Sequence, residues 1–148
     1  MSSGTFTLIE ALGGKSVLGP TLVKHFLCGR TVQLLQSGLP YRSVELLRSR
    51  LRLSKKDLSH YLAVAPRTLE RRQSAKVLHP HESERVYRLA RVYAKAVQVL
   101  GSEDQALVWL RHPSKTLGNV IPLSLLASEE GARQVENELN GIEHNVYA

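Results

Sequence analysis

The stretch LSKKDLSHYLAVAPRTLERRQSAK, residues 53–76, decides the fold of this chain. Ser54 with Asp57 three residues later resembles a capping box, which predicts a helix that begins at Lys55. Pro66 marks the start of a second helix, because proline is tolerated in a first helical turn. Two short helices joined by a tight turn, the second rich in arginine, are typical of a helix-turn-helix that binds DNA.

Two kinds of DNA contact are expected from this segment. The second helix of a helix-turn-helix presents its N-terminal residues to base edges, while other cations contact phosphates. Arginine can hold guanine and glutamine can hold adenine through paired hydrogen bonds. The residues expected to reach bases are Arg67, Thr68, Arg71 and Gln73. The residues expected to contact phosphates are Lys55, Lys56, Arg72 and Lys76.

The packing side of the same segment is apolar. Leu58 and Leu62 are expected to pack the first helix, Val64 to fill the turn and Leu69 to anchor the second helix. The turn carries Ala63 where glycine is common, and Ala65 cannot cap the second helix with its side chain. A basic helical hairpin with a solvated arginine face, which binds no DNA, stays open as an alternative.

The other boundary signals are also helix signals. The first twenty residues are rich in glycine and are expected to be irregular or only partly helical. Apolar residues then recur at helical spacing from Thr21 to Gly38, which predicts one helix there. Further helices are expected over 41–52, from Pro80 to Gly101, from Ser102 to Pro113, briefly after Pro122, and after Ser128. Since no stretch alternates with a period of two, the predicted fold class is all-α.

Charge is unevenly distributed along the 148 residues, whose formal net charge is +7. Residues 41–96 carry 14 Lys and Arg against 5 Asp and Glu, whereas residues 97–148 carry 3 against 7. A basic middle followed by an acidic end indicates two surfaces with two different partners.

Composition limits the class of protein. With 43% hydrophobic residues and no apolar run long enough to cross a bilayer, the chain is expected to be a folded protein of the cytoplasm without a membrane partner. The single cysteine, Cys28, excludes an internal disulfide and is expected to be a small buried hydrophobe.

The second informative stretch is ALVWLRHPSKTLGNVIPLSLLASEEGARQVENEL, residues 106–139. Trp109 suits either the core or an interface. The segment also holds more apolar side chains than so short a piece buries easily, which favours a partner surface. These side chains are Leu117, Pro122, Leu123, Leu125 and Leu126.

Three further patterns complete a resemblance: SGLPYRSVELL at 37–47, PRTLERR at 66–72 and ESERVYRLARVYAKAVQVLG at 82–101. Together with the C-terminal stretch, they make the chain similar to the Xre/ParS-type antitoxins of toxin–antitoxin systems. The resemblance implies an Xre-like helix-turn-helix domain at 37–96 and a toxin-binding domain at 97–148, and residues 1–36 are expected to form an N-terminal extension with a helix.

The resemblance also implies a function. The C-terminal domain is expected to silence a co-encoded RES-domain toxin, an enzyme that consumes NAD⁺. The helix-turn-helix is expected to bind operator DNA and repress the operon, and the chain to form a homodimer within a larger complex. Neither catalysis nor a cofactor is implied. The rival interpretation is a stand-alone repressor whose C-terminal domain only dimerises.

One hypothesis locates the toxin contact. A pocket that binds the phosphates of NAD⁺ is expected to be cationic, so an acidic helix and C-terminal tail could dock there and exclude substrate. The alternative is a tail that frays in solvent. The residues expected to bind toxin are Trp109, Leu117, Leu125, Glu136, Glu138, Glu143, Tyr147 and Ala148.

Two other motifs carry no site. Gly14-Lys15-Ser16 has the ending of a phosphate-binding loop, but Ile9 stands where the first glycine is needed. His79 and His81 lack the cysteine or carboxylate partners of a zinc site, so no metal is expected.

Overall fold

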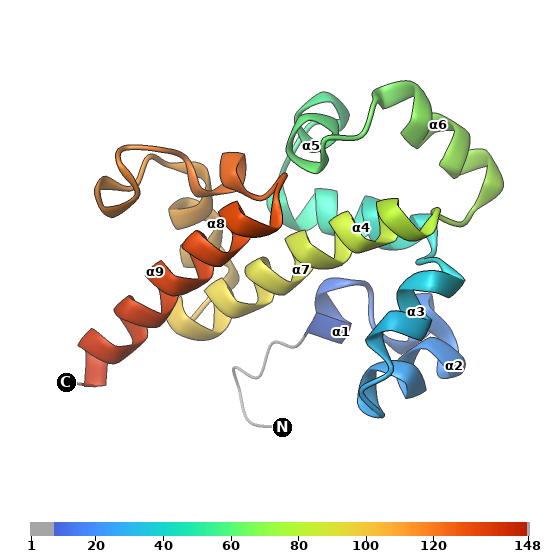
Figure 1. Ribbon diagram of the computed structural model, residues 1–148, viewed down its shortest axis with the longest axis horizontal. Coiled ribbons are helices and arrows are strands. Elements are labelled where there is room, and N and C mark those ends of the chain that lie inside the picture. Colours follow the sequence, from blue (N-terminus) through green and yellow to red (C-terminus); the bar gives the residue numbers. More distant parts are fainter. Residues whose placement is uncertain (1–7, 148) are drawn as a thin grey trace.

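The computed structural model describes residues 8–147, and all regular structure in that range is helical (Figure 1). The predicted all-α class is confirmed. The first elements are α1 (Leu8–Ala11), α2 (Lys15–Leu27), α3 (Thr31–Ser37), α4 (Tyr41–Leu51), α5 (Lys55–Leu62) and α6 (Pro66–Ala75). The rest are α7 (Pro80–Leu100), α8 (Glu103–Arg111), the 3₁₀ helices η1 (Lys115–Leu117) and η2 (Pro122–Leu125), and α9 (Glu129–Tyr147).

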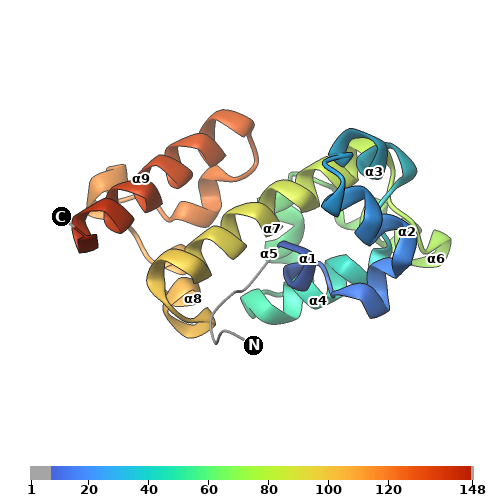
Figure 2. The same ribbon diagram turned by 90° about the horizontal axis from the view of Figure 1, so that it is seen from below.

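Helix α7 forms the centre of the molecule, and helices from both ends of the chain pack on it (Figures 1 and 2). Its N-terminus is capped by Glu82, whose side chain accepts the backbone N–H of His79, and Gly101 ends it with a positive φ of 95°. The apolar stripe that helical spacing predicts from Val86 to Leu100 is buried as far as Val97, and Leu100 is half-buried. The domain boundary expected at 96/97 falls within this helix, which serves both halves of the chain.

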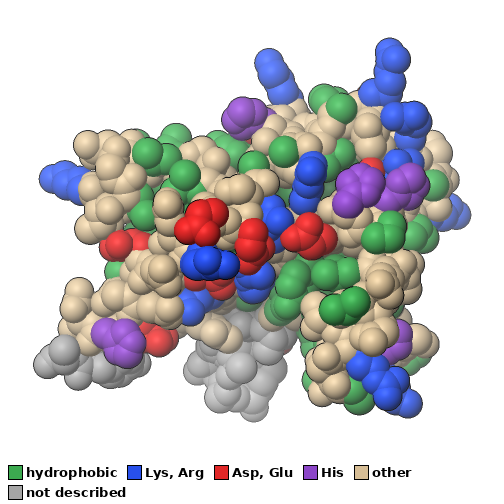
Figure 3. All heavy atoms as spheres, viewed as in Figure 1, with side chains coloured by type: hydrophobic (Ala, Val, Ile, Leu, Met, Phe, Trp, Pro, Cys, Tyr) green, Lys and Arg blue, Asp and Glu red, His purple; other side chains and the backbone are tan. Residues whose placement is uncertain are grey.

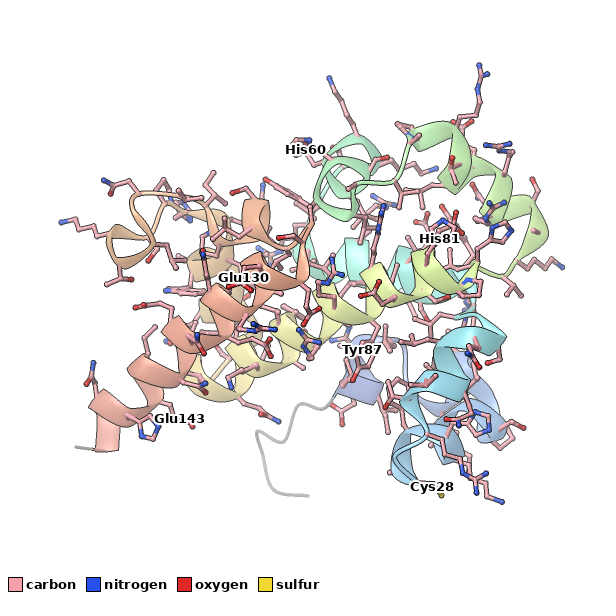
Figure 4. The ribbon with its side chains drawn as sticks, viewed as in Figure 1. Cys28, His60, His81, Tyr87, Glu130 and Glu143 are labelled. Carbon is pink, nitrogen blue, oxygen red and sulfur yellow. The ribbon has the colours of Figure 1, made fainter. Side chains whose placement is uncertain are left out.

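The single helix predicted from Thr21 to Gly38 is wrong. The chain forms α2 and α3 instead, and they are separated by a turn in which Gly29 has a φ of 72°. Arg30 donates its backbone N–H to the carbonyl of His25 at 2.7 Å and closes the turn. As a result Leu27 is 75% exposed rather than buried. Cys28 is also exposed, against the expectation of a buried thiol, because it lies at this corner (Figure 4).

The C-terminal half follows the predicted boundaries closely. Ser102 accepts the backbone N–H of Gln105 at 3.1 Å, and Ser128 accepts that of Gly131 at 3.0 Å, so both serines cap the helices that follow them. Gly118 and Asn119 both adopt positive φ and form a turn between η1 and η2. The apolar side chains of this half divide into two groups. Pro122, Leu123 and Leu126 are buried, whereas Leu117 and Leu125 are half-buried.

Close packing of α9 against η2 depends on a glycine. A Cβ atom at Gly131 would lie 1.9 Å from the carbonyl oxygen of Leu125, which is backbone and cannot rotate away. Gly141 lies in the same helix and has open space around it. A substitution at Gly131 therefore tests the close packing of α9 on η2, whereas a substitution at Gly141 tests only helix propensity.

We expect Gly131→Ala to destabilise the protein by about 3 kcal/mol, because α9 must move away from η2. Gly141→Ala should instead stabilise it by about 0.5–1 kcal/mol, since alanine favours the helix. Urea unfolding followed by circular dichroism measures both. Similar changes in the two variants would contradict the close approach.

Candidate nucleic-acid interface and partner-binding surface

Helices α5 and α6 form the predicted helix-turn-helix. Ser54 caps α5 by accepting the backbone N–H of Asp57 at 3.0 Å. Ala63 takes the left-handed conformation that glycine usually provides, with a φ of 55°. Val64 is 8% exposed and fills the turn, as expected, and its carbonyl accepts the buried Ser59 hydroxyl. Ala65 precedes α6 without a side-chain cap.

An arginine from α7 holds this turn. The Arg85 guanidinium donates a hydrogen bond to the Ala63 carbonyl, which belongs to the unpaired C-terminal end of α5. No pattern within residues 53–76 indicates this contact, because the donor lies on another helix. Arg85 therefore fixes where α6 begins relative to α7.

The exposed face of α6 follows from its helical period. Leu69 is buried and points to the core, so Arg67 and Arg71, one turn apart, lie on the outward face. Both are exposed, as expected of side chains that reach bases. Thr68 is half-buried beside them, and its hydroxyl accepts a 3.4 Å hydrogen bond from Arg71. Gln73 is exposed on the flank that faces α4.

Arg72 requires a correction. Its Nε donates to Glu82 Oε1 at 2.7 Å, and Glu82 is 1% exposed. Burial opposes ionisation of Glu82, but hydrogen bonds from Arg72 and the His79 backbone outweigh it and hold the pKa of this carboxyl below its usual range. The guanidinium is thus engaged inside the protein. We remove Arg72 from the phosphate contacts.

Cations begin several helices of this half, where the helix dipole opposes them. Lys55 and Lys56 lie in the first turn of α5, Arg67 in that of α6 and Arg42 in that of α4. Acidic residues lie in the first turns of α7, α8 and α9, and Asp57 follows the two lysines in that of α5. Helix stability therefore does not account for the first set of cations. Basic side chains project at the α5–α6 end of the molecule in Figure 3.

The C-terminal half presents an apolar groove on α8. It is formed by Leu100, Asp104, Gln105, Val108 and Trp109. Val108 is 59% exposed, whereas Trp109 is half-buried and also packs against the core. Trp109 therefore has the core contact that its sequence context allowed, and its role at an interface stays a prediction. Such a groove suits a protein partner.

Part of the acidic charge of this half is neutralised internally. Glu136 accepts from Arg91 at 2.9 Å, and Glu129 accepts from both Arg91 and Arg88. Arg88 is 7% exposed and also donates to the carbonyl of Ala127. Figure 3 shows acidic and basic side chains interleaved near the middle of one face of the molecule. The uneven charge along the sequence therefore has two sources. Some carboxylates of α9 pair with arginines of α7, and other charges lie on separate surfaces.

The remaining predicted toxin-binding residues lie toward the end of α9. Glu138 is half-buried and Glu143 is exposed near the C-terminus (Figure 4). Tyr147 ends α9, but the position of its side chain and all of Ala148 lie outside the described residues.

Other kinds of site were sought over the same range. Between residues 8 and 147 no group of three or more His, Cys, Asp or Glu side chains is arranged to hold a metal ion. No described helix is long and apolar enough to span a membrane.

Comparison with known proteins matches both halves of the chain to one family. Residues 31–91 match the antitoxin Xre-like helix-turn-helix domain, and residues 95–144 match the antitoxin Xre/MbcA/ParS C-terminal toxin-binding domain. The chain belongs to the Xre antitoxin family. It is thus the antitoxin of a toxin–antitoxin system, and its C-terminal half is a toxin-binding domain rather than a module that only dimerises.

Curated relatives agree with this assignment. An antitoxin Xre from Photorhabdus laumondii is 34% identical over 115 residues, which cover 76% of this chain and 78% of the relative. An antitoxin Xre from Yersinia enterocolitica is 30% identical over 146 residues, which cover 97% and 93%.

A solved structure shares the fold. The Mycobacterium tuberculosis MbcT–MbcA toxin–antitoxin complex contains a chain that aligns with a TM-score of 0.52 at 24% identity. The alignment covers 68% of this Xre antitoxin and 90% of that chain.

The buried ion pair of Arg72 and Glu82 yields a pH-dependent prediction. Because the folded pKa of Glu82 is lowered, the pair stabilises the protein above the ordinary carboxyl value of 4.5 and stops doing so as the pH falls through the folded pKa. We expect Glu82→Gln to destabilise the protein by about 2 kcal/mol at pH 7, since it leaves Arg72 without its counter-charge.

The stability difference between wild type and Glu82→Gln should shrink below about pH 4. Chemical unfolding at a series of pH values measures it. Glu143→Gln removes an exposed carboxyl and is the matched control, expected to change stability little. If Glu82→Gln stays less stable than the wild type by the same amount at acidic pH, the result would contradict the ion pair.

Proposed function

We propose that this antitoxin neutralises a co-encoded RES-domain toxin that degrades NAD⁺ and represses its own operon through α5 and α6. The observation that carries the DNA role is the helix-turn-helix braced by α7, with Arg67 and Arg71 outward and Lys55 and Lys56 exposed in the first turn of α5. The toxin class rests on the resemblance of residues 106–139 to RES-linked antitoxins. Both activities are binding, without catalysis or a cofactor.

The apolar groove on α8 is the proposed centre of the toxin contact. Val108 is an exposed aliphatic side chain beside the half-buried Trp109, and tryptophan is among the residues that contribute most to binding at protein interfaces. Leu117 and Leu125 add half-buried apolar area from η1 and η2. Glu138, Glu143 and the tail with Tyr147 and Ala148 provide the acidic edge that would enter a cationic NAD⁺ pocket.

Glu136 contributes to the toxin surface in a different way. Its carboxylate already accepts from Arg91 and is 23% exposed, so it holds α9 on α7 rather than offering a free charge. Its role in toxin binding is therefore to position the helix that carries Glu138 and Glu143.

A homodimer is proposed to pair through the N-terminal helices. Leu27 at the end of α2 is 75% exposed and Val32 at the start of α3 is 63% exposed. A second copy would cover these apolar side chains. Two α6 helices would then read half-sites separated by about 34 Å or a multiple of it.

We expect Arg71→Ala to lower the affinity for operator DNA by about 1–3 kcal/mol, because it removes a base contact. Fluorescence anisotropy with a duplex from upstream of the gene measures the change, and a random duplex measures specificity. Arg133→Ala is the control, since Arg133 is an exposed arginine of α9 paired only with Glu130 among the described residues. Equal affinities of the wild type and Arg71→Ala for the operator would exclude Arg71 as a reader.

Val108→Glu should weaken toxin binding at least tenfold, about 1.4 kcal/mol, because it buries a charge in the apolar interface. The fold should survive, since this side chain is 59% exposed. The measurement is NAD⁺ loss with purified toxin at graded antitoxin concentrations. Gln36→Glu on α3 adds the same charge to an exposed position of the other half and should leave inhibition intact.

Deletion of residues 145–148 tests the proposed contact of the C-terminal tail independently of the proposed contact of the α8 groove. If the tail enters the toxin pocket, the shortened antitoxin still binds toxin through α8 but no longer prevents NAD⁺ loss. Full inhibition by the shortened chain would reject the tail as the element that excludes substrate, and would leave the α8 groove as the proposed contact.

A further inference from the structure

A second positively charged surface lies beside the helix-turn-helix. It is a groove where α2, α4 and α6 meet, and we call it the α2–α4–α6 groove. Its polar lining comes from Ser16, Tyr41, Arg42, Gln73 and Lys76. No acidic residue lines it. Arg42 and Lys76 are exposed, and neither forms an ion pair with any residue between 8 and 147.

Backbone hydrogen bonds fix the spacing of the two cations. The N–H of Tyr41 donates to the carbonyl of Lys76 at 3.0 Å, and the N–H of Leu78 donates to the carbonyl of Leu39 at 2.9 Å. The end of α6 is therefore tied to the start of α4. Arg42 and Lys76 stand on either side of this junction, so the groove is part of the folded scaffold.

The backbone conformation of Lys76 is informative. It ends α6 with a φ of 68°, in the left-handed region where glycine or asparagine is favoured. A lysine there is strained, and its side chain forms no hydrogen bond or ion pair within the described residues that would offset the strain. This cation is therefore left without a partner in the described part of the chain.

The N-terminal extension closes the other side of the groove. The buried hydroxyl of Ser43 on α4 donates to the carbonyl of Leu12 at 2.7 Å, which anchors the loop before α2. Gly13 in this loop has a φ of 110° and no room for a side chain, because a Cβ would lie 2.8 Å from Leu46 Cδ1. Ser16 and the neighbouring Lys15 are thereby held next to α4.

We propose that the α2–α4–α6 groove binds the phosphate backbone of DNA beside the bases that α6 reads. The proposal rests on the proposed DNA-binding function. Two observations identify the occupant: the groove carries cations without carboxylates, and Gln73 and Lys76 make it continuous with α6. A helix in the major groove has a phosphate strand along each flank, and this groove lies along the flank of α6 that faces α4. The N-terminal extension thus enlarges the DNA footprint.

The test uses the full-length protein with Arg42→Gln and Lys76→Gln combined. The probes are a duplex of about 40 bp, roughly four helical turns, from upstream of the gene and a random duplex of equal length. Affinity is measured by anisotropy over a series of KCl concentrations. Lys115→Gln in η1 removes a charge from the other half of the chain and is the control.

Each lost phosphate contact should reduce the slope of log affinity against log salt by about 0.9 and weaken binding about tenfold near 0.1 M salt. The double variant should therefore lose nearly two units of slope, equally on both duplexes. Its preference for the upstream duplex should not change. Arg42→Lys with Lys76→Arg should restore the slope, and thermal melting confirms that the variants fold.

The other outcomes separate the possible failures. An unchanged slope, while Arg71→Ala still weakens binding to the upstream duplex, overturns the groove proposal alone. Loss confined to the upstream duplex would mean base reading and also overturns it. Unchanged DNA binding with lost toxin inhibition would assign the groove to an acidic protein surface. A wild type that binds neither duplex overturns both this inference and the proposed DNA function.

Discussion

The structure depends on helix α7, whose side chains form ion pairs and hydrogen bonds with the segments on both of its sides. Glu82 of α7 pairs with Arg72 of α6, Arg85 donates to the turn of the helix-turn-helix, and Arg88 donates to the carbonyl of Ala127 in the C-terminal half. Arg88 is 7% exposed, and burying a guanidinium is costly unless its donors are matched by acceptors. The positions of α6 and α9 are therefore both set by α7.

Local signals in the sequence were sufficient for most helix boundaries. Ser54, Ser102 and Ser128 each accept a backbone N–H three residues later, as their spacing predicts. These contacts involve neighbouring residues, so no knowledge of the fold is needed. The break between α2 and α3 could not be predicted, because apolar spacing continued across Gly29 and hid the turn.

The position of a site residue could likewise be predicted where it depends on neighbouring residues, and not where its partner is distant in the sequence. The outward position of Arg67 and Arg71 follows from the helical period once Leu69 is assigned to the core. The engagement of Arg72 could not be foreseen, since its partner Glu82 lies on the next helix, ten residues away. Likewise Glu136 pairs with Arg91 across 45 residues, which a count of charges along the chain cannot reveal.

The second helix of the helix-turn-helix, α6, is held by its neighbours more than by its own sequence. Non-glycine residues with positive φ precede and follow it, Ala63 and Lys76, and its N-terminus lacks a side-chain cap. Each feature costs about 1 kcal/mol, so the contacts from α7 must offset them. The toxin-binding half packs on the same helix, and η2 also touches α5. The helix-turn-helix and the toxin-binding half are therefore in direct contact, and both are supported by α7.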